Sequence, residues 1–438
     1  MVSIEQLYSY FQEHPVICTD SRQITPGCLF FALKGEKFDG HQYAAKAISE
    51  GAGYAVVSDP ALDGQPGMLL VEDTLSALQQ LATFHRRKFQ IPVIAIGGSN
   101  GKTTTKELVS AVLSSHYPCH FTKGNFNNHL GVPLTLLSMP SDTEVAVIEM
   151  GANHPGEIDE LCRIAEPTHG LLTNIGKEHL EGFGSLAGVK KAEGELYRFL
   201  HKKGGCAFVN MSEKYLAAMT KNNKRKVMYA EATTLHGLQD TFIEIQQLCQ
   251  TPFVEVAFIG EYHKPVEIKT HLFGRHNFFN IISAIALGVY FKVPAAKIKK
   301  AIEDYVPSNN RSQVLQQDTN TLILDAYNAN PSSMEAALTS FAAMKAAHKV
   351  AILGDMLELG EHSRHEHEQI LHKAHKLGFQ LLVLVGPQFG DLHADTPGVR
   401  HFPTSQAARD WYRAQNFQDT YLLLKGSRGI RLETIIEP

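Results

Sequence analysis

Short apolar runs separated by amphipathic stretches recur along the chain. In the first 84 residues, apolar runs predict strands at Val16–Cys18, Cys28–Leu33, Ala55–Val57 and Met68–Val71. Apolar residues at helical spacing predict helices at His41–Glu50 and Thr74–Lys88. We therefore expect a small N-terminal α/β domain over residues 1–84. Its polar turns, Thr19–Arg22 and Lys34–His41, are either a binding face or ordinary capped turns.

The same alternation continues over residues 85–305. It predicts strands at Pro92–Ile96, Val145–Ile148, Gly170–Thr173 and Ala207–Val209, and helices at Thr103–Ser110, Pro155–Ala165 and Leu186–Leu200. Strands that are apolar on both faces and alternate with helices are typical of a parallel sheet that is covered on both sides. In such sheets, ligands bind beyond the carboxyl ends of the strands.

A third α/β domain is predicted for residues 306–438, after the polar break Val306–Asn310. The expected strands are Leu322–Leu324, Val350–Leu353, Leu381–Val385 and Tyr421–Leu424, and the expected helices are Ser333–Ala346, Glu366–Leu377 and Gln406–Asn416. Asp325, Asp355 and Lys425 follow three of these strands. The domain is Rossmann-like but lacks a glycine-rich dinucleotide fingerprint, and we expect it to close over the active site by a hinge.

A glycine-rich segment lies between the predicted strand at 92–96 and the helix at 103–110. Glycines allow the backbone to approach a ligand closely, and the N–H groups at a helix N-terminus attract phosphate. Lys102 would reach the terminal phosphates, and the Thr103 hydroxyl would join a Mg²⁺ shell. The spacing departs from the standard P-loop, because three residues instead of four separate Gly97 from Gly101. The segment predicts a nucleoside triphosphate site that comprises Gly98, Ser99, Asn100, Gly101, Lys102, Thr103 and Thr104.

Two further candidates follow the ends of neighbouring strands. Glu149 ends an apolar strand, where a nucleotide-hydrolysing P-loop enzyme holds its metal. His179 follows the next strand and is a possible metal ligand through its neutral imidazole. The chain has 22 histidines, however, and any one of them is more often structural than a metal ligand. We expect the cluster His362, His365, His367, His372 and His375 to be a solvated helix face.

Composition excludes several classes of partner. The chain of 438 residues is 44% hydrophobic and 20% charged, with a net charge of −4, so it offers no electrostatic case for nucleic acid or an anionic membrane. Its first residues lack the features of a signal peptide, and no apolar run reaches the roughly 18 residues of a membrane anchor. Six cysteines without CxxC spacing indicate reduced thiols. We expect a cytoplasmic protein.

Several ordered motifs then carry a resemblance over all three domains. They include Gly98-Ser-Asn-Gly-Lys-Thr-Thr104, Gly124-Asn-Phe-Asn-Asn128, Glu149-Met-Gly-Ala-Asn-His-Pro-Gly-Glu157, Thr173-Asn-Ile-Gly-Lys-Glu-His179, Gly274-Arg-His-Asn-Phe-Phe-Asn280, Asp325-Ala-Tyr-Asn-Ala-Asn-Pro331 and Lys425-Gly-Ser-Arg428. The chain resembles the Mur ligases, ATP-dependent amide-forming enzymes of peptidoglycan synthesis. This resemblance implies transfer of the γ-phosphate of ATP to a peptide carboxylate of a UDP-sugar, followed by attack of an amine on the acyl phosphate.

Within the family, some segments are most similar to the members that add D-alanyl-D-alanine to UDP-N-acetylmuramoyl-tripeptide. These segments are Gly124–Asn128, Glu149–Glu157, Tyr327–Pro331 and Asp355–Gly360. The resemblance therefore implies these two substrates and, from the habit of the family, a monomer.

The resemblance also implies roles for individual residues. Lys102, Glu149 and His179 would be catalytic, with Thr103 and Glu149 holding one Mg²⁺ and His179 a second. Asn277 would contact adenine, and Arg311 and Asp325 would reach phosphate and ribose. Ser21 and Arg22 would meet the UDP-sugar. The resemblance implies no role that we can derive for Lys425.

One departure from the family pattern concerns the second metal. Many Mur ligases have Ala-Lys-Gly-Glu after the histidine motif, with a carbamylated lysine that supplies a metal-binding carboxylate. Here the segment is Ala192-Glu193-Gly194-Glu195. We expect Glu193 to supply the oxygen ligands that Mg²⁺ prefers. The alternative is that Lys190 or Lys191 is modified instead.

Two other functions remain open at this level. The chain could be a sister Mur ligase or a folylpolyglutamate synthase, although Asn125–Asn128 and Tyr327–Pro331 argue against both. It could also be a nucleotide-dependent switch, although Glu149 and His179 are more than a switch requires.

Overall fold

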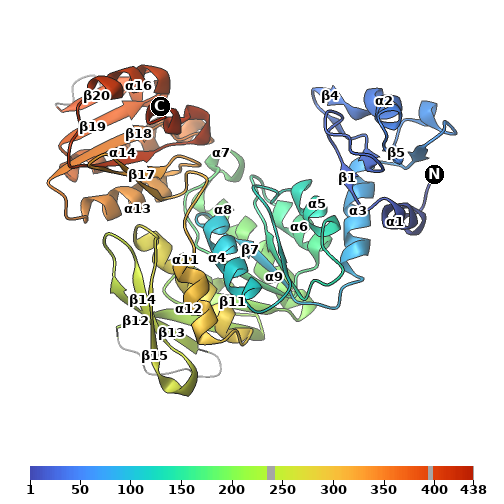
Figure 1. The fold of residues 1–438 in the computed structure, drawn as a ribbon, viewed down its shortest axis with the longest axis horizontal. Helices are drawn as coiled ribbons and strands as arrows, with labels where there is room; N and C mark the ends of the chain where they lie inside the picture. Colours follow the sequence, from blue (N-terminus) through green and yellow to red (C-terminus); the bar gives the residue numbers. More distant parts are fainter. Residues whose placement is uncertain (234–241, 393–397, 438) are drawn as a thin grey trace.

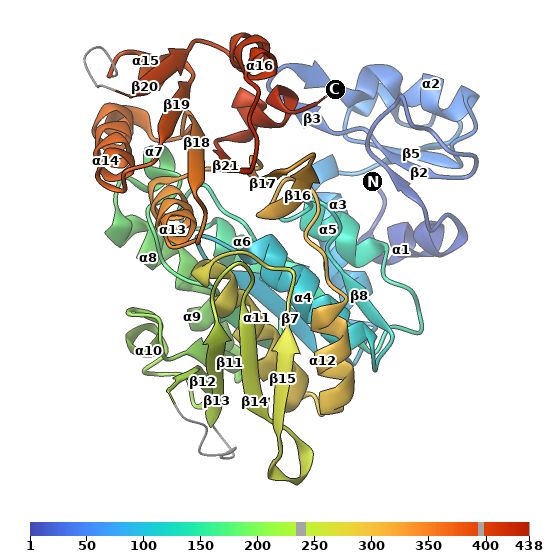
Figure 2. The same cartoon turned by 60° about the vertical axis from the view of Figure 1, so that its left-hand side comes forward.

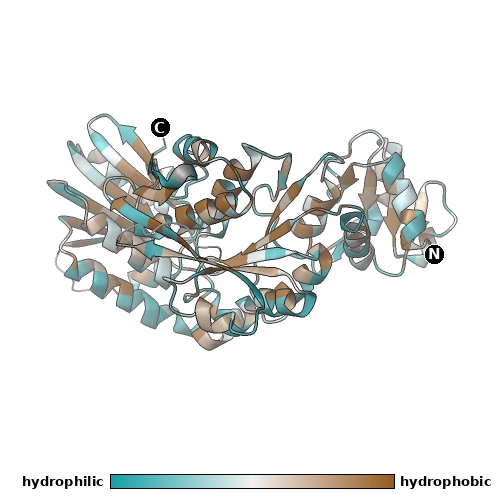
Figure 3. Ribbon diagram, turned by 90° about the horizontal axis from the view of Figure 1, so that it is seen from below, coloured by the Kyte–Doolittle hydropathy of each residue, from teal (hydrophilic) through white to brown (hydrophobic). Residues whose placement is uncertain are grey.

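The computed structural model describes residues 1–233, 242–392 and 398–437, which form three successive α/β units (Figure 1). In this view the central unit lies between the N-terminal unit and the C-terminal unit. The strands are mostly hydrophobic and the outer helices mostly hydrophilic, so each sheet forms the centre of a core (Figure 3). Among the described residues, no helix is long and apolar enough to cross a membrane.

The N-terminal unit is built on a four-stranded parallel sheet. Its strand order is β1 (Ile17–Cys18), β2 (Leu29–Phe31), β5 (Tyr54–Val57) and β6 (Met68–Leu70). The remaining elements are the hairpin β3 (Lys34–Gly35) and β4 (Phe38–Asp39), η1 (Gly40–Tyr43), η2 (Pro60–Leu62), α1 (Ile4–Glu13), α2 (Ala44–Ser49) and α3 (Thr74–Arg86). The predicted strands and helices are confirmed. Helix α1 was not predicted, although Ser3 and Gln6 form the capping box that marks its start.

The central unit has a nine-stranded sheet. Its order is β15 (Pro265–Lys269), β14 (Glu255–Ile259), β13 (Phe242–Cys249), β12 (Arg225–Ala232), β11 (Cys206–Asn210), β10 (His169–Leu172), β7 (Val93–Gly97), β9 (Val145–Glu149) and β8 (Cys119–Phe121). The strands from β8 to β13 are parallel, as predicted. Five strands of this sheet were not predicted: β8, β12 and β13, which belong to its parallel part, and β14 and β15, which are antiparallel and lie at the lower edge of Figure 2.

The helices of the central unit cover this sheet. They are α4 (Lys102–Ser114), α5 (Gly131–Leu137), α6 (Glu157–Ala165), α7 (Leu180–Phe183), α8 (Leu186–Glu193), α9 (Glu195–Lys203), α10 (Leu216–Met219), η3 (Glu261–His263), α11 (Arg275–Tyr290) and α12 (Ala295–Glu303). The single helix predicted at 186–200 is divided at Gly194, which lies between α8 and α9. Glycine is a poor helix former, so a break is favoured there.

The C-terminal unit has a six-stranded sheet. Its order is β16 (Gln313–Gln317), β17 (Asn320–Asp325), β21 (Thr420–Lys425), β18 (His348–Gly354), β19 (Leu381–Val385) and β20 (Val399–Phe402), and β16 is antiparallel to β17. The helices are α13 (Pro331–Ala342), η4 (Gly360–His362), α14 (Ser363–Lys376), α15 (Pro387–Gly390), α16 (Ser405–Ala414), η5 (Arg428–Ile430) and η6 (Leu432–Ile435).

The prediction of a solvated histidine face is wrong for His367. This side chain is fully buried on α14, where its Nε2 accepts a hydrogen bond from the Met356 N–H at 3.0 Å. Ile370 and Leu371 are buried three and four positions further along α14, so His367 lies on the same apolar stripe of the helix. His365, His372 and His375 are exposed, as predicted.

Helix α3 joins the N-terminal unit to the central unit. Leu78 and Leu81 of α3 share one continuous core with residues from both units, including Leu29 of β2 and Leu136 of α5. The predicted boundary at residue 84 therefore lies inside helix α3, which packs against both the N-terminal unit and the central unit.

Candidate active site

The glycine-rich loop between β7 and α4 is held by the chain that follows β10. Gly98 and Gly101 have φ angles of 109° and 80°, which side-chain-bearing residues rarely adopt. A Cβ on Gly98 would lie 2.4 Å from the Thr173 hydroxyl oxygen, and one on Gly101 would lie 2.4 Å from Asn280 Oδ1. The Asn100 N–H donates to Asn174 Oδ1 at 3.1 Å. The loop is therefore fixed in shape by tertiary contacts as well as by its glycines.

Lys102 points back across this loop and lies among acidic side chains. Its Nζ donates to the Gly98 carbonyl at 2.5 Å and lies 3.3 Å from Glu178 Oε2. Burial by itself lowers the pKa of Lys102, but the carboxylates of Glu178, Glu193 and Glu149 outweigh burial and raise it. Lys102 therefore stays protonated, with a charge available for phosphate.

Glu149 lies at the end of β9, beside the first turn of α4. Its Oε1 accepts hydrogen bonds from the Thr103 hydroxyl at 3.1 Å and from Asn127 Nδ2 at 2.8 Å. Its Oε2 is buried and has no hydrogen-bond partner among the residues that the structure describes. Thr103 and Glu149, which the sequence assigned to one metal, thus lie in direct contact.

Glu193 ends α8 directly behind the loop. Its side chain is 0% exposed, and its Oε2 accepts the Gly98 N–H at 2.7 Å. Burial, together with the Glu178 carboxylate, raises the pKa of Glu193 to about 7, against the opposing effect of Lys102. Lys190 and Lys191, the two lysines considered for modification in place of Glu193, do not lie behind the loop. Lys191 is exposed, and the Lys190 ammonium lies 4.8 Å from the Tyr215 ring centroid.

Glu178 is a site residue that the sequence reasoning missed. It is buried next to Lys102, and within the described parts of the chain its Oε1 has no hydrogen-bond partner. The only signal was its position immediately before His179, in the segment after β10. Glu149, Glu178 and Glu193 therefore each keep one buried oxygen without a partner.

His179 connects the central unit to the C-terminal unit. Its Nδ1 lies 2.6 Å from Glu358 Oε2, and its Nε2 lies 4.0 Å from Glu178 Oε2. Two more contacts cross the same boundary: Asn330 Nδ2 donates to Asn100 Oδ1 at 2.8 Å, and Lys177 Nζ lies 2.5 Å from Glu366 Oε1. The C-terminal unit is thus docked against the glycine-rich loop.

The other predicted nucleotide contacts lie along the same cleft. Asn277, on α11, donates to the Phe273 carbonyl at 2.8 Å and accepts from Asn280. Arg311 stacks over the Tyr327 ring, with its Cζ 3.8 Å from the ring centroid. Asp325 pairs with Lys425, whose Nζ lies 2.6 Å from Asp325 Oδ2.

These side chains line a cleft of about 840 Å³ between the central and C-terminal units. Of the predicted site residues, it brings together Ser99, Asn100, Gly101, Lys102, Thr103, Thr104, Glu149, His179, Asn277, Arg311 and Asp325. Gly98 and Glu193 lie immediately behind its wall.

One group of predicted residues is not gathered in the cleft. Ser21 and Arg22 lie on the N-terminal unit and do not line it; the Arg22 side chain is 86% exposed and pairs with Asp20. Within residues 1–233, 242–392 and 398–437, no set of three or more His, Cys, Asp or Glu side chains is arranged as a metal site. The predicted metal ligands are therefore near one another without forming a complete cage.

Comparison with known proteins decides between the functions left open above. Residues 96–288 match the family described as the Mur ligase middle domain, and residues 310–428 match the Mur ligase, glutamate ligase domain. Residues 15–86 match the Mur ligase family, catalytic domain. A Bacillus subtilis UDP-N-acetylmuramoyl-tripeptide–D-alanyl-D-alanine ligase is 33% identical over 96% of this chain and 92% of its own length. The chain belongs to the Mur ligase family.

Two further relatives support the assignment of this chain to the Mur ligases. An Escherichia coli protein with the same name is 35% identical, again over 96% of this chain and 92% of the relative. A crystal structure of MurF from Acinetobacter baumannii superposes with a TM-score of 0.87 at 31% identity, covering 99% of this chain and 97% of that one. The protein is an ATP-dependent amide-bond-forming ligase, which excludes the nucleotide-dependent switch.

Proposed function

We propose that this protein joins the amino group of D-alanyl-D-alanine to the terminal peptide carboxylate of UDP-N-acetylmuramoyl-tripeptide, with cleavage of ATP. The observation that carries this proposal is the likeness over almost the whole chain to relatives that bear this activity in their names. The cleft supports it, because the phosphate loop and the end of the C-terminal sheet face the same space.

The reaction would proceed in two steps. A carboxylate oxygen of the tripeptide attacks the γ-phosphorus of ATP, and ADP leaves. The uncharged amine of the dipeptide then attacks the acyl carbon, and inorganic phosphate leaves as the amide forms and the amine loses a proton. Phosphoryl transfer depends mainly on positioning and on neutralising charge. Lys102 and the loop N–H groups would position the γ-phosphate and neutralise its charge.

The residues present fit Mg²⁺, which would neutralise phosphate charge when bound. Around Lys102, three buried carboxyl groups face one ammonium, and each has an oxygen that no described residue contacts by a hydrogen bond. Hard cations such as Mg²⁺ prefer oxygen ligands of this kind. Thr103 and Glu149 would hold one ion, and Glu178, His179 and Glu193 would hold a second directly or through water.

The remaining assignments follow the same proposal. Asn277 would contact adenine, Arg311 and Asp325 would reach phosphate and ribose, and Ser21 and Arg22 would meet the UDP-sugar. Residues 1–84, 85–305 and 306–438 would bind the UDP-sugar, bind ATP and close over the active site, respectively. We place this activity in the cytoplasm, with the protein acting as a monomer.

Phosphate release tests the proposed reaction. ATP, Mg²⁺ and UDP-N-acetylmuramoyl-tripeptide are incubated with and without D-alanyl-D-alanine, and the product mass is measured. We expect release and amide formation to require both substrates. Lys102→Ala should lower the rate by about a hundredfold or more, the cost of removing one transition-state donor. Release that ignores the dipeptide, or amide formation with L-lysine or glutamate instead, would contradict the acceptor assignment.

A further inference from the structure

His179, the candidate ligand of the second Mg²⁺, faces two carboxylates that come from different units. Its Nδ1 lies 2.6 Å from Oε2 of Glu358, which belongs to the C-terminal unit. Its Nε2 lies 4.0 Å from Oε2 of Glu178, a member of the buried carboxyl cluster around Lys102. Both His179 and Glu358 line the cleft. One ring nitrogen is therefore engaged by the C-terminal unit, and the other is turned towards the candidate metal ligands.

This arrangement matches the way in which proteins support a metal-binding histidine. Such a histidine binds the metal through one ring nitrogen and almost always donates the N–H of the other to a carboxylate, a backbone carbonyl or water. The second contact fixes the tautomer and the orientation of the ring, and it leaves a lone pair for the metal. Glu358 occupies the position of the outer carboxylate, and Nε2 is the nitrogen left for the metal. Ligand and support come from different units of the chain.

The backbone is unusual at both ends of this contact. His179 and Glu358 have φ angles of 41° and 64°, in the left-handed region that side-chain-bearing residues rarely adopt. Such conformations are costly, persist only where the surroundings hold them, and concentrate at functional sites. Here the Glu181 N–H donates to the Glu358 carbonyl at 3.4 Å, and Leu180 is buried in the core of the C-terminal unit. Helix α7, which begins at Leu180, is thus seated against that unit (Figure 1).

The segment that carries Glu358 is fixed from inside the C-terminal unit. The Met356 N–H donates to Nε2 of the fully buried His367 at 3.0 Å. The Leu357 N–H donates to the Ser427 hydroxyl, also at 3.0 Å. The two residues before Glu358 are therefore bonded to distant parts of the same unit. The Glu358 carboxylate moves with that unit and reaches the metal-site histidine only when the unit is docked.

We propose that Glu358 is a positioning residue for His179, so that docking of the C-terminal unit completes the second Mg²⁺ site. This role rests on the proposed function, because His179 is a ligand only where a second ion serves the reaction. If docking raises the affinity for the ion, the ion must favour docking by the same factor. Binding of the second ion should therefore draw the C-terminal unit towards the central unit.

Mn²⁺ binding to the full-length protein tests this role, since Mn²⁺ accepts the same oxygen ligands as Mg²⁺. The protein is saturated with β,γ-methylene-ATP, which cannot release its γ-phosphate. Electron paramagnetic resonance counts free Mn²⁺, and small-angle scattering gives the radius of gyration of the same samples. Glu358→Ala removes the supporting carboxylate. Glu358→Gln keeps a side-chain oxygen that can accept the Nδ1–H of the histidine.

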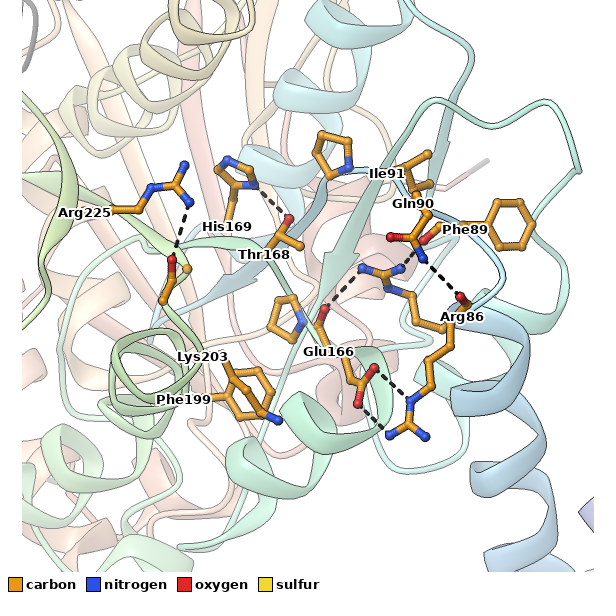
Figure 4. Close-up of a pocket in the computed structure, with 15 residues that line it drawn as sticks. Arg86, Phe89, Gln90, Ile91, Glu166, Thr168, His169, Phe199, Lys203 and Arg225 are labelled. Atoms are coloured by element: carbon orange, nitrogen blue, oxygen red, sulfur yellow. Dashed lines mark hydrogen bonds and ion pairs between the residues drawn. The ribbon is translucent and has the colours of Figure 1, made fainter.

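Two glutamates serve as controls for Glu358. Glu361 lies on the same segment, and its side chain is 90% exposed. Glu166 has the same left-handed backbone, with a φ angle of 42°, and its carboxylate accepts hydrogen bonds from Arg87 at 2.7 and 3.1 Å (Figure 4). It precedes β10, whereas the cleft lies beyond the other end of that strand. Glu361→Ala and Glu166→Ala therefore remove a comparable charge without touching the metal site.

We expect two Mn²⁺ sites in the unmodified protein. In Glu358→Ala, one site should lose affinity about tenfold or more, the usual cost of removing the outer partner of a metal ligand. The site at Thr103 and Glu149 should not change. Glu358→Gln should retain most of the affinity, and both controls should match the unmodified protein. A single Mn²⁺ site, two unchanged sites in Glu358→Ala, or an equal loss in either control would overturn the proposal.

Scattering separates this positioning role from that of a simple latch. Mn²⁺ added beyond the first equivalent should reduce the radius of gyration of the unmodified protein, because the ion and the docked unit stabilise each other. Lys177→Ala lacks a different contact across the same boundary but keeps Glu358, so it should contract as well. Glu358→Ala should not contract. Equal contraction of Glu358→Ala and Lys177→Ala would reduce Glu358 to a latch and overturn the proposal.

Amide formation, measured separately, distinguishes the two possible failures. Normal amide formation by the unmodified protein, with Mn²⁺ binding that ignores Glu358→Ala, would refute the positioning role alone. Mn²⁺ binding that depends on Glu358, in a protein that forms no amide from the two proposed substrates, would refute the proposed reaction and support the metal site.

Discussion

At the scale of single residues, the site is marked by an excess of buried negative charge. Lys102 alone cannot neutralise Glu149, Glu178 and Glu193 around it, even though the pKa of Glu193 is raised to about 7 and this side chain is only partly ionised at neutral pH. Burying charge without a partner is costly, so such a cluster is expected to pair with a cation that comes with the ligand. Glu193 has a second task, because its other oxygen accepts the Gly98 N–H of the phosphate loop.

The variant Glu193→Gln separates the negative charge of Glu193 from its hydrogen bond with the Gly98 N–H. The amide oxygen can still accept the Gly98 N–H, but the charge is lost. We expect Mg²⁺ affinity, measured by calorimetry with ADP present, to fall about tenfold or more, as when a supporting group of a metal site is removed. The melting temperature without Mg²⁺ should change little.

Lys190→Ala and Lys191→Ala are the matched controls for Glu193→Gln. Both lysines lie on the same helix, and we expect Mg²⁺ affinity to remain at the level of the unmodified protein. Loss of affinity in either lysine variant, with Glu193→Gln unaffected, would support the carbamylated-lysine alternative instead.

At the scale of elements, α3 is fixed to α6 by the last turn of each helix. Arg86 of α3 donates to the carbonyls of Ala165 and Glu166 at the end of α6, which have no further turn to bond to. The Thr83 hydroxyl donates to the Ile164 carbonyl at 3.1 Å. The N-terminal unit is therefore attached to the central unit through polar contacts as well as through the shared core.

Arg86→Met tests this attachment. It keeps most of the side-chain volume but leaves three carbonyls without their donor, which should cost about 2–4 kcal/mol of stability. Arg87→Met is the control, because Arg87 is largely exposed and its ion pair with Glu166 should contribute about 1 kcal/mol or less. Urea unfolding of both variants checks the difference; equal midpoints would show that Arg86 is not structurally important.

A second element-scale feature is the pairing of β17 with β21, which places Asp325 opposite Lys425. Burial acts to raise the pKa of Asp325, but Lys425 and then His276 outweigh it, so the pKa lies below its usual value. The ionised form is thus favoured by folding. Its stabilisation is present above the unfolded pKa of about 4 and is lost as the pH falls through the lower, folded value.

Asp325→Asn should therefore destabilise the protein in a pH-dependent way. At pH 7 the buried Lys425 would lose its counter-charge, at a cost of about 3 kcal/mol. The difference from the unmodified protein should shrink as the pH falls from about 4 towards 2, since the aspartate then becomes neutral as well. Urea midpoints at pH 7 and pH 3 measure it, and Asp325→Asn/Lys425→Met should recover part of the loss. A difference that is constant with pH would refute the ion-pair explanation.

At the scale of the whole molecule, the C-terminal unit is docked by polar contacts and by Leu180 and Phe273 of the central unit, which pack into its core. Asn330 to Asn100, Glu358 to His179 and Glu366 to Lys177 cross the boundary near the active site. Relative motion of two domains is expected unless the interface between them is large and hydrophobic. Opening would separate Asn330 from the phosphate loop and give substrates access to the cleft.

Lys177→Ala should shift the free protein towards an open arrangement, because it leaves the buried Glu366 without its partner. Since Lys177 is 44% exposed, solvent screens the pair, and we expect about 1 kcal/mol, or about a fivefold change in the open-to-closed ratio. Small-angle scattering should report a larger radius of gyration. Lys373→Ala is the control, because its pair with Glu335 lies within the C-terminal unit. An unchanged radius for Lys177→Ala would argue against this contact as a latch.

The elements and the phosphate loop could be predicted because they depend on neighbours in the chain. Apolar alternation located most of the strands, and the glycines next to Lys102 and Thr103 marked a site formed by consecutive residues. The missed features depend on distant residues. Glu178 became recognisable only beside Lys102, His367 only against the core, and Asn330 lies 230 positions from Asn100, with which it pairs.

The sequence by itself indicated three successive α/β units, most of their strands, the loop that would hold phosphate, and the resemblance to the family. Those properties follow from local backbone preferences and from motifs that are contiguous in the chain. Only the tertiary structure decided which carboxylates surround Lys102 and how the C-terminal unit meets the phosphate loop. Such contacts join residues far apart in the chain, and the packing of whole units, which no local pattern encodes, sets the distances between them.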